Sequence, residues 1–339
     1  MNILSKQFLI QTTPPPSYTY EAYYINNGTM TSLGTLTDLS KTFAAKDEFI
    51  YSNVFVYEGD LYNNGSRITT GRNITSVTGR TSSSNYYGYF IEGGKLYYFD
   101  TSMNISQVGS ATDWIKVSGY AYSGTSTSMA YRAIGEASDG LWYIKTSTQG
   151  RISTLTNWTQ ISGYGNENAS TQYGYGINNG KLYYLYANGN GAVQQGTDTT
   201  WTQVSGSRET YWYGYGINAG KLYALNGTPT QIGSDTTWTK VSGESATNSN
   251  AYSLGINAGK LYKIKQTTAT QIGSSTDWKN CSGFATGTTI YALAYDSSAL
   301  YKVDADGNLT KLMDGDFVYC GQNYSSSSAY AVAIRRITQ

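Results

Sequence analysis

The feature that most constrains this chain is an internal repeat with a period near 40 residues. Residues 214–223 read GYGINAGKLY, and residues 254–262 read LGINAGKLY. An apolar-aromatic pair marks each copy and falls at Leu61-Tyr62, Leu96-Tyr97, Leu141-Trp142, Leu182-Tyr183, Leu222-Tyr223, Leu261-Tyr262 and Leu300-Tyr301. A period of this size is typical of a fold built from stacked copies of one supersecondary unit.

Each copy carries four short apolar stretches in a fixed order, seen most clearly in residues 201–233. These stretches read WTQVSG, YGYGI, KLYAL and TQIG. The second alternates apolar and small residues at period two, which predicts a half-buried strand. A Gly or Asn-Gly pair separates the second stretch from the third in most copies and predicts a tight hairpin. Four strands in about 40 residues are the signature of a β-propeller blade.

The composition favours strands over helices throughout the chain. The sequence contains 34 Tyr and 38 Gly, and no glycine-free stretch shows the i, i+3, i+4, i+7 apolar spacing of a helix. Tyr suits a pleated sheet, whereas Gly weakens a helix. We therefore expect an all-β chain.

Counting first strands gives eight blades, with seven as the alternative because residues 20–70 are compressed. The first strands are expected at residues 49–52 and 74–79 and at segments beginning with Trp114, Trp158, Trp201, Trp238, Trp278 and Phe317. The last is followed by one more strand, at residues 329–334. Residues 29–33 and 35–39 are expected to supply the missing third and fourth strands, so both ends of the chain share one blade and remove a free edge. Residues 1–17, which end near three prolines, are expected to form an extended arm outside a propeller spanning residues 18–339.

Composition also restricts the function. Charged residues make up 13% of the chain and the formal net charge is +1, so we expect no nucleic-acid partner. No apolar run reaches the roughly 18 residues of a membrane span, and the first ten residues lack a signal-peptide cleavage site, so neither membrane insertion nor export is expected.

The two cysteines are expected to be buried free thiols. Cys281 and Cys320 occupy the core position held by Val117, Ile161, Val204 and Val241 in other copies. Equivalent positions on neighbouring blades are too far apart for the Cα separation of about 4.4–6.8 Å that a disulfide needs.

The order Trp-x-x-Val-Ser-Gly, alternating strand, Gly-Lys-Leu-Tyr resembles the repeat of the regulator of chromosome condensation family over residues 72–321. The resemblance implies a propeller. It implies little about function, because that repeat serves exchange factors, lectin-like proteins and viral structural proteins. The chain contains no His, and the family's Gly-Gln-Leu-Gly stretch is reduced to Gln-Ile-Gly at residues 231–233 and 271–273. Nucleotide exchange on a small GTPase is therefore not expected.

The near-identical blades, rich in Tyr, Gly, Ser, Thr and Asn, resemble tail and fibre proteins of bacteriophages in general texture. The expected function is that of a non-enzymatic virion structural protein, a tail, fibre or capsid-decorating component assembled in the host cytoplasm. The alternative is a free bacterial lectin-like or scaffold propeller. Without His, a Ser-His-Asp triad or a His-based zinc site cannot be built, and we expect no metal and no cofactor.

Candidate binding residues lie in the connections from first to second strands, which are long, variable and rich in Tyr and Ser. Flat rings and small polar groups on a rigid scaffold suit recognition of a host glycan or protein receptor. The candidates are Tyr120, Tyr122, Tyr164, Tyr211, Trp212 and Tyr324. For Trp212, the alternative is packing between loops, and the loops as a whole have the alternative of being merely solvated. The apolar residues of the arm, Phe8, Leu9 and Ile10, are the candidates for anchoring the protein to other virion proteins.

Two acidic patterns are expected to be structural. Asp113, Asp235 and Asp277 precede the repeated Trp, where an Asp typically closes a turn by bonding the backbone. Residues 304–308 read DADGN and lack the glutamate that would complete a calcium loop, so a hairpin turn is expected there.

Overall fold

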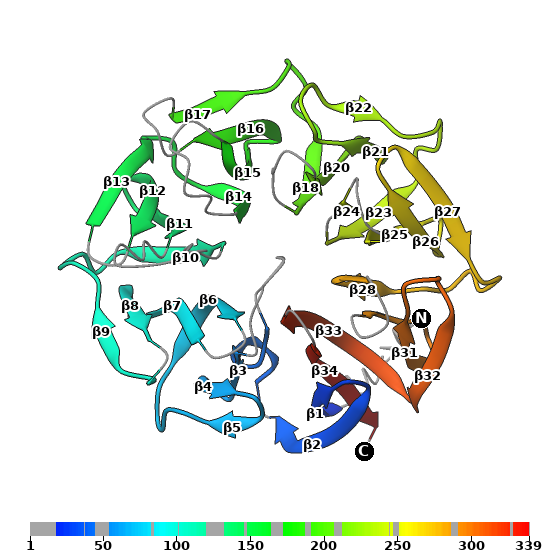
Figure 1. Ribbon diagram of the computed structural model, residues 1–339, viewed down its shortest axis with the longest axis horizontal. Helices are drawn as coiled ribbons and strands as arrows, with labels where there is room; N and C mark the ends of the chain where they lie inside the picture. The colour runs from blue at the N-terminus through cyan, green and yellow to red at the C-terminus, as the bar shows by residue number, and fades with distance from the viewer. Residues whose placement is uncertain are drawn as a thin grey trace, which may run out of the picture.

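The computed structural model describes residues 18–36, 38–44, 54–82, 85–100, 102–119, 132–145, 148–163, 172–186, 191–206, 212–243, 245–246, 251–285, 291–325 and 328–338. Their strands form eight blades around a central axis (Figure 1). The protein is thus an all-β, eight-bladed propeller, and the alternative count of seven is wrong. The helical content of the described residues is a single 3-10 turn, η1 (Leu39–Lys41).

The first four blades follow the chain in simple order. Blade 1 consists of β3 (Val54–Tyr57), β4 (Asp60–Asn63) and β5 (Ser66–Arg67). Blade 2 consists of β6 (Ile74–Ser82), β7 (Asn85–Glu92), β8 (Lys95–Phe99) and β9 (Ile105–Gln107). Blade 3 consists of β10 (Trp114–Ser118), β11 (Arg132–Ala137), β12 (Gly140–Lys145) and β13 (Thr148–Ser153). Blade 4 consists of β14 (Trp158–Gly163), β15 (Gln172–Asn178), β16 (Lys181–Tyr186) and β17 (Gly191–Gln194).

The next three blades have the same antiparallel order, with short extra strands between them. Blade 5 consists of β18 (Trp201–Ser205), β20 (Tyr215–Asn218), β21 (Lys221–Ala224) and β22 (Thr230–Gln231). Blade 6 consists of β23 (Trp238–Ser242), β25 (Tyr252–Asn257), β26 (Lys260–Lys265) and β27 (Thr268–Ile272). Blade 7 consists of β28 (Asn280–Ser282), β30 (Ala292–Tyr295), β31 (Ala299–Val303) and β32 (Leu309–Asp314).

Blade 8 joins the two ends of the chain, as predicted. Its strands are β33 (Asp316–Ser325), β34 (Ser328–Thr338), β1 (Tyr18–Asn26) and β2 (Thr29–Leu36), in that order from the first. The predicted identity of the last two strands is wrong, because residues 29–36 form one strand rather than two. Gly34 adopts a positive φ of 115° within a bulge, and the pairing shifts there from Ala22↔Gly34 to Tyr23↔Ser32. A glycine that reads as a turn in the sequence thus bends a continuous strand.

Blade 1 departs most from the repeat. Phe43 forms an isolated bridge with Val56, at the place of a first strand, while the first strand predicted at residues 49–52 lies outside the described residues. Asp60 organises the blade, since it accepts hydrogen bonds from the N–H of Arg72 at 2.9 Å and of Gly71 at 3.2 Å and from Thr69 at 3.1 Å, and pairs with Arg67. Burial raises the pKa of this carboxyl, but these donors outweigh burial and lower the pKa overall.

The repeated Trp packs in the core between its own blade and the preceding blade. In blade 5 the ring of Trp201 lies 5.1 Å from that of Tyr223, centroid to centroid, and crosses Gly216. A Cβ added at Gly216 would lie 2.9 Å from Cζ3 of Trp201. The same combination occurs in blades 4 and 6 as Trp158, Gly176, Tyr183 and Trp238, Gly255, Tyr262. In these three blades the Gly leaves room for the indole ring, and the aromatic residue of the apolar-aromatic pair packs against it.

The Val-Ser-Gly of each first strand connects neighbouring blades. The hydroxyl of Ser162 donates to the carbonyl of Gly206 at 2.7 Å, and the hydroxyl of Ser205 donates to the carbonyl of Gly243 at 3.0 Å. Thr78 makes the same bond from blade 2 to blade 3. These residues are 38 to 44 positions apart, which is about one repeat. The hydroxyl of one copy is therefore hydrogen-bonded to the backbone of the next copy.

Both cysteines are free and buried, as predicted. Cys281 is 1% exposed and Cys320 is 3% exposed, each in the core between blades. Burial raises the pKa of the Cys281 thiol to about 12 and also raises the pKa of Cys320. The thiols therefore serve as small apolar residues.

Candidate functional site

The propeller has two unlike faces. The turn face carries the connections from second to third strands and from each fourth strand to the next blade. Its hairpins are tight, since Ala219 and Gly220 have φ values of 49° and 73°, and Ala258 and Gly259 repeat this with 47° and 74°. In blades 2, 4, 5 and 6 the carbonyl of the hairpin Gly accepts from the N–H of the next Trp, as Gly220 does from Trp238 at 2.9 Å. In blade 3 the side chain of Glu136 takes this place. One bonding scheme is thus repeated around this face.

The acidic residues before the repeated Trp complete the turn face. Asp235 accepts from Nδ2 of Asn257 at 2.9 Å, and Asp198 accepts from Nδ2 of Asn218 at 2.8 Å. Asp113 and Asp277 accept from hydroxyls of Ser138 and Ser297. These Asp residues do close turns, but their bonds run to side chains at the hairpin of the blade that follows rather than to the local backbone. DADGN at residues 304–308 forms a hairpin turn, as expected, with Asn308 N–H donating to Asp304 at 2.8 Å.

The loop face carries the connections from first to second strands and from third to fourth strands. Four of the predicted binding residues fall outside the described residues: Tyr120, Tyr122, Tyr164 and Tyr211. Phe8, Leu9 and Ile10 of the predicted arm also lie outside the described residues. Their proposed roles stay predictions.

Trp212 and Tyr324 have described backbones that differ from the predicted loops. Trp212 belongs to β19 (Trp212–Tyr213), which pairs with β24 (Ser245–Ala246) of blade 6 in the register Trp212↔Ala246. Tyr324 lies near the end of β33 and pairs with Ala329. The Ser-rich segment after Cys320 is therefore a β-hairpin rather than a loop, because the long alternation of β33 and β34 extends the pairing beyond the blade.

Connections on the loop face bond across blade boundaries. Besides the pairing of β19 with β24, β29 (Phe284–Ala285) of blade 7 pairs with β25 of blade 6, joining Tyr252 to Ala285. Three neighbouring blades are thus tied together at this face by backbone bonds. No sequence pattern predicts this pairing, because the partners lie about 30 residues apart in segments without regular alternation.

A belt of polar side chains lies on the inner side of the first strands, two residues after the repeated Trp or its equivalent. Oε1 of Gln160 accepts from the N–H of Val204 at 2.8 Å, and Oε1 of Gln203 accepts from the N–H of Val241 at 2.8 Å. Ser76 accepts from Val117 at 3.1 Å in the same way. The inner strand is a sheet edge with unpaired N–H groups, and the belt satisfies them from the preceding blade.

Blade 3 carries a buried charge that the sequence analysis missed. Glu136 is 1% exposed, and its Oε1 accepts from the N–H of Trp158 at 2.9 Å. Its Oε2 lies 3.3 Å from Nζ of Lys116, which also donates to the carbonyl of Trp158. Aligning the copies would have shown an acid where blades 4 to 6 have Ile177, Ile217 and Ile256. These contacts join blade 3 to blade 4.

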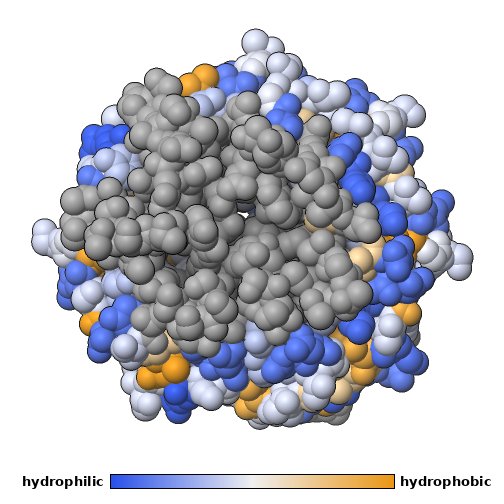
Figure 2. All heavy atoms as spheres, in the orientation of Figure 1, coloured by the Kyte–Doolittle hydropathy of each residue, from blue (hydrophilic) through white to orange (hydrophobic). Residues whose placement is uncertain are grey.

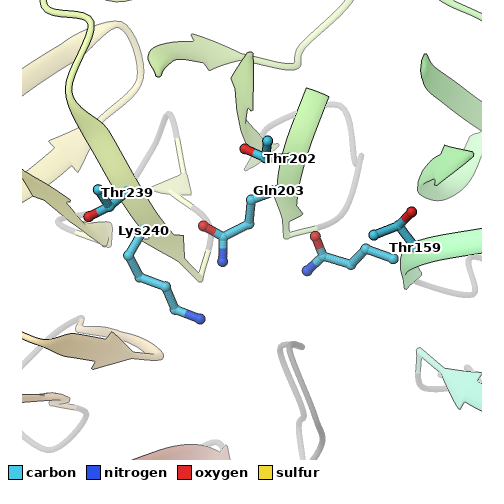
Figure 3. A pocket seen from close by; sticks show the side chains of 6 residues that line it. Thr159, Thr202, Gln203, Thr239 and Lys240 are labelled. Carbon is cyan, nitrogen blue, oxygen red and sulfur yellow. The ribbon is translucent and has the colours of Figure 1, made fainter. Parts of the chain in front are cut away.

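An inner cavity of about 310 Å³ opens beside this belt between blades 4, 5 and 6. Its lining residues are Thr159, Gln160, Thr202, Gln203, Thr239 and Lys240. Figure 3 shows the side chains of Gln203 and Lys240 extending from β18 and β23 into the same space. The lining contains one cation and no acid. Figure 2 shows one face of the propeller, on which the described residues at the periphery are predominantly hydrophilic.

Two negative findings apply to the described part of the chain. No group of three or more His, Cys, Asp or Glu side chains is arranged there to hold a metal ion. No helix in the described ranges is long and apolar enough to cross a membrane.

Fold and site together define an eight-bladed β-propeller with a repetitive turn face, a variable loop face and a polar inner cavity. No protein-family model matches the chain, and no curated protein matches it. Among solved structures, it is similar to virginiamycin B lyase from Staphylococcus aureus, with 9% identity, a TM-score of 0.38, and 94% and 100% of the two chains covered. It is also similar to AztD of Citrobacter koseri, with 9% identity, a TM-score of 0.47, and 95% and 99% covered. Dihydro-heme d1 dehydrogenase NirN matches with 12% identity, a TM-score of 0.48, and 87% and 73% covered. At these identities no function passes from those proteins to this one.

Proposed function

We propose that this protein is a non-enzymatic recognition propeller that binds a host-surface glycan or protein through its loop face. The observation that carries the proposal is the contrast between the two faces. On the turn face, the same backbone and Asp-centred bonds recur from blade to blade. On the loop face, the connections differ in length and sequence from copy to copy, while backbone pairing ties blades 5, 6 and 7 together. Variable polar-aromatic segments on a rigid base are the design of a recognition surface.

The biological setting that we propose is a virion, in which the protein is a tail, fibre or capsid-decorating component. Support for this setting is the composition and repeat texture of the sequence. In this proposal residues 1–17, with Phe8, Leu9 and Ile10, anchor the propeller to other virion proteins, and the loop face meets the host.

The test of the loop face is binding of the purified protein to intact cells and to a glycan array. The variant Tyr211→Ala/Trp212→Ala removes the two adjacent aromatic residues of that face. The matched control is Tyr18→Ala, because Tyr18 is 39% exposed and starts β1 at the turn face. The proposal requires that binding falls at least tenfold in the double variant and is unchanged in the control. Equal binding by all three proteins would place the recognition surface elsewhere.

The test of the anchor is separate. Particles assembled with a chain lacking residues 1–17 should lose the propeller, and Phe8→Ser/Leu9→Ser/Ile10→Ser should reproduce the loss. A truncated propeller that still copurifies with particles would overturn the anchoring role and leave the loop-face proposal intact.

A further inference from the structure

Lys240 breaks the belt of polar side chains on the inner strands. At the same position in blades 2, 4 and 5, Ser76, Gln160 and Gln203 each accept a backbone N–H of the following blade. Lys240 makes no such bond, and it has no hydrogen-bond or ion-pair partner among the described residues. In the following blade, the equivalent N–H, that of Cys281, bonds instead to Oδ1 of Asn280 at 2.9 Å.

The substitution is therefore compensated locally, and the ammonium of Lys240 is released toward the inner cavity. Blades 4 and 5 have Gln at this position, so the bond between blades does not by itself require a Lys. Lys240 is half-buried, and the lining residues of this cavity include no acid. The ammonium of Lys240 is therefore available to pair with an anionic ligand.

The other lining groups add neutral donors and acceptors. The N–H of Val241 can only donate, so it fixes Oε1 of Gln203 on itself at 2.8 Å and turns Nε2 away as a donor. The hydroxyls of Thr202 and Thr239 donate to the carbonyls of Ile217 and Ile256 at 3.4 Å, which leaves their oxygens as acceptors. Figure 3 shows Gln203 and Lys240 extending into one space, with Thr202 and Thr239 beside them on the same two strands.

We infer that the inner cavity binds a small hydroxylated carboxylate, of the size and chemistry of an acidic monosaccharide. Lys240 pairs with the carboxylate, Nε2 of Gln203 donates to a ligand oxygen, and the Thr oxygens accept from ligand hydroxyls. The cavity of about 310 Å³ is at the lower end of ligand sites, which run from about 300 to 1,000 Å³, and so fits a single sugar ring rather than a chain. This site is distinct from the loop face and does not depend on the function proposed for it.

The experiment is calorimetric titration of the full chain with glucuronate at constant ionic strength. Glucose is the uncharged analogue and serves as the control ligand. Acetate tests the carboxylate without the hydroxyls. Three variants separate the roles: Lys240→Gln removes the cation, Gln203→Glu keeps an oxygen for Val241 but places a carboxylate beside Lys240, and Lys221→Gln removes an equal charge at the turn face. Thermal unfolding of each variant confirms that it is folded.

Glucuronate should bind saturably and at least tenfold more tightly than glucose or acetate. Lys240→Gln and Gln203→Glu should each weaken binding by tenfold or more, the effect expected for losing a charge-assisted bond, while Lys221→Gln should leave it unchanged. Equal affinity for glucose overturns the role of the cation, and equal affinity for acetate overturns recognition of the hydroxyls. Absence of glucuronate binding, or binding that Lys240→Gln leaves intact, overturns the site.

Discussion

The bond from Ser205 to Gly243 offers a direct test of how the blades are held together. Ser205 is 3% exposed, and its hydroxyl donates at 3.0 Å to the carbonyl of Gly243, itself buried in the next blade. Ser205→Ala removes the donor and leaves the carbonyl in a place that water does not reach. The bond joins two blades rather than two strands of one sheet, so its loss weakens the contact between repeats.

The magnitude follows from the cost of an unsatisfied buried acceptor. A typical hydrogen bond contributes about 0.5–1.5 kcal/mol net, and stranding its buried partner costs about 1–3 kcal/mol. We expect Ser205→Ala to lower the free energy of unfolding by about 1–2 kcal/mol. Thr202→Ala, in the same strand, removes an exposed hydroxyl with a long 3.4 Å bond and should change it by less than about 0.5 kcal/mol.

The measurement is urea unfolding followed by tryptophan fluorescence, with the midpoint compared at a constant slope. Ser205→Thr is the rescue variant, because Thr78 makes the equivalent bond in blade 2. It should retain at least half of the stability lost in Ser205→Ala. If Ser205→Ala and Thr202→Ala shift the midpoint equally, the Val-Ser-Gly motif does not hold the blades together and the reasoning fails.

Three further predictions concern the core and its titrating groups. Gly255→Ala should cost about 1–3 kcal/mol in urea unfolding, because the added Cβ would lie 2.8 Å from Cζ3 of Trp238; a neutral result would show that the indole ring can shift. Folded Cys281 keeps its proton up to about pH 12, while the unfolded thiol loses it near pH 9, so the free energy of unfolding should fall as pH rises above about 9. The fall should be less steep in Cys281→Ala/Cys320→Ala, since burial also raises the pKa of Cys320. Identical slopes of stability against pH in the two proteins would contradict this. Asp60 has a lowered pKa in the folded state, so its contribution to the free energy of unfolding is present above about pH 4 and is lost in acid. Asp60→Asn should lower the free energy of unfolding by about 1.5–3 kcal/mol at pH 7. The variant should also lose less stability than the parent protein as the pH falls below about 4, measured by thermal unfolding.

The repeat predicted the fold well because its signals are local. Alternation at period two, a Gly-containing hairpin and a recurring Trp are each read within about ten residues, and they gave eight blades with shared ends. The strands contributed by the N-terminus were assigned wrongly, since Gly34 marks a bulge within β2 and not a turn. A Gly with a positive φ occurs both in bulges and in turns, and only the pairing with the neighbouring strand shows which of the two is present.

The candidate site was predicted less completely. Variable aromatic loops were recognisable from composition, but not the pairing of Trp212 with Ala246, which joins two blades. Lys240 attracted no notice in the sequence, because a Lys among Gln and Ser on a strand is ordinary. Its meaning depends on the neighbouring blade, where Asn280 supplies the bond that Lys240 does not make.

The sequence by itself determined the strands of the regular copies, their order, the propeller class and the burial of the Cys positions, because each depends on periodicity and side-chain type within one copy. The tertiary structure decided which groups meet across blade boundaries: Ser205 with Gly243, Gln203 with Val241, and the open space beside Lys240. The physical reason is that a near-identical repeat carries the same local signals in every copy. Function then resides in departures from the repeat, and those departures acquire partners only when the ring closes.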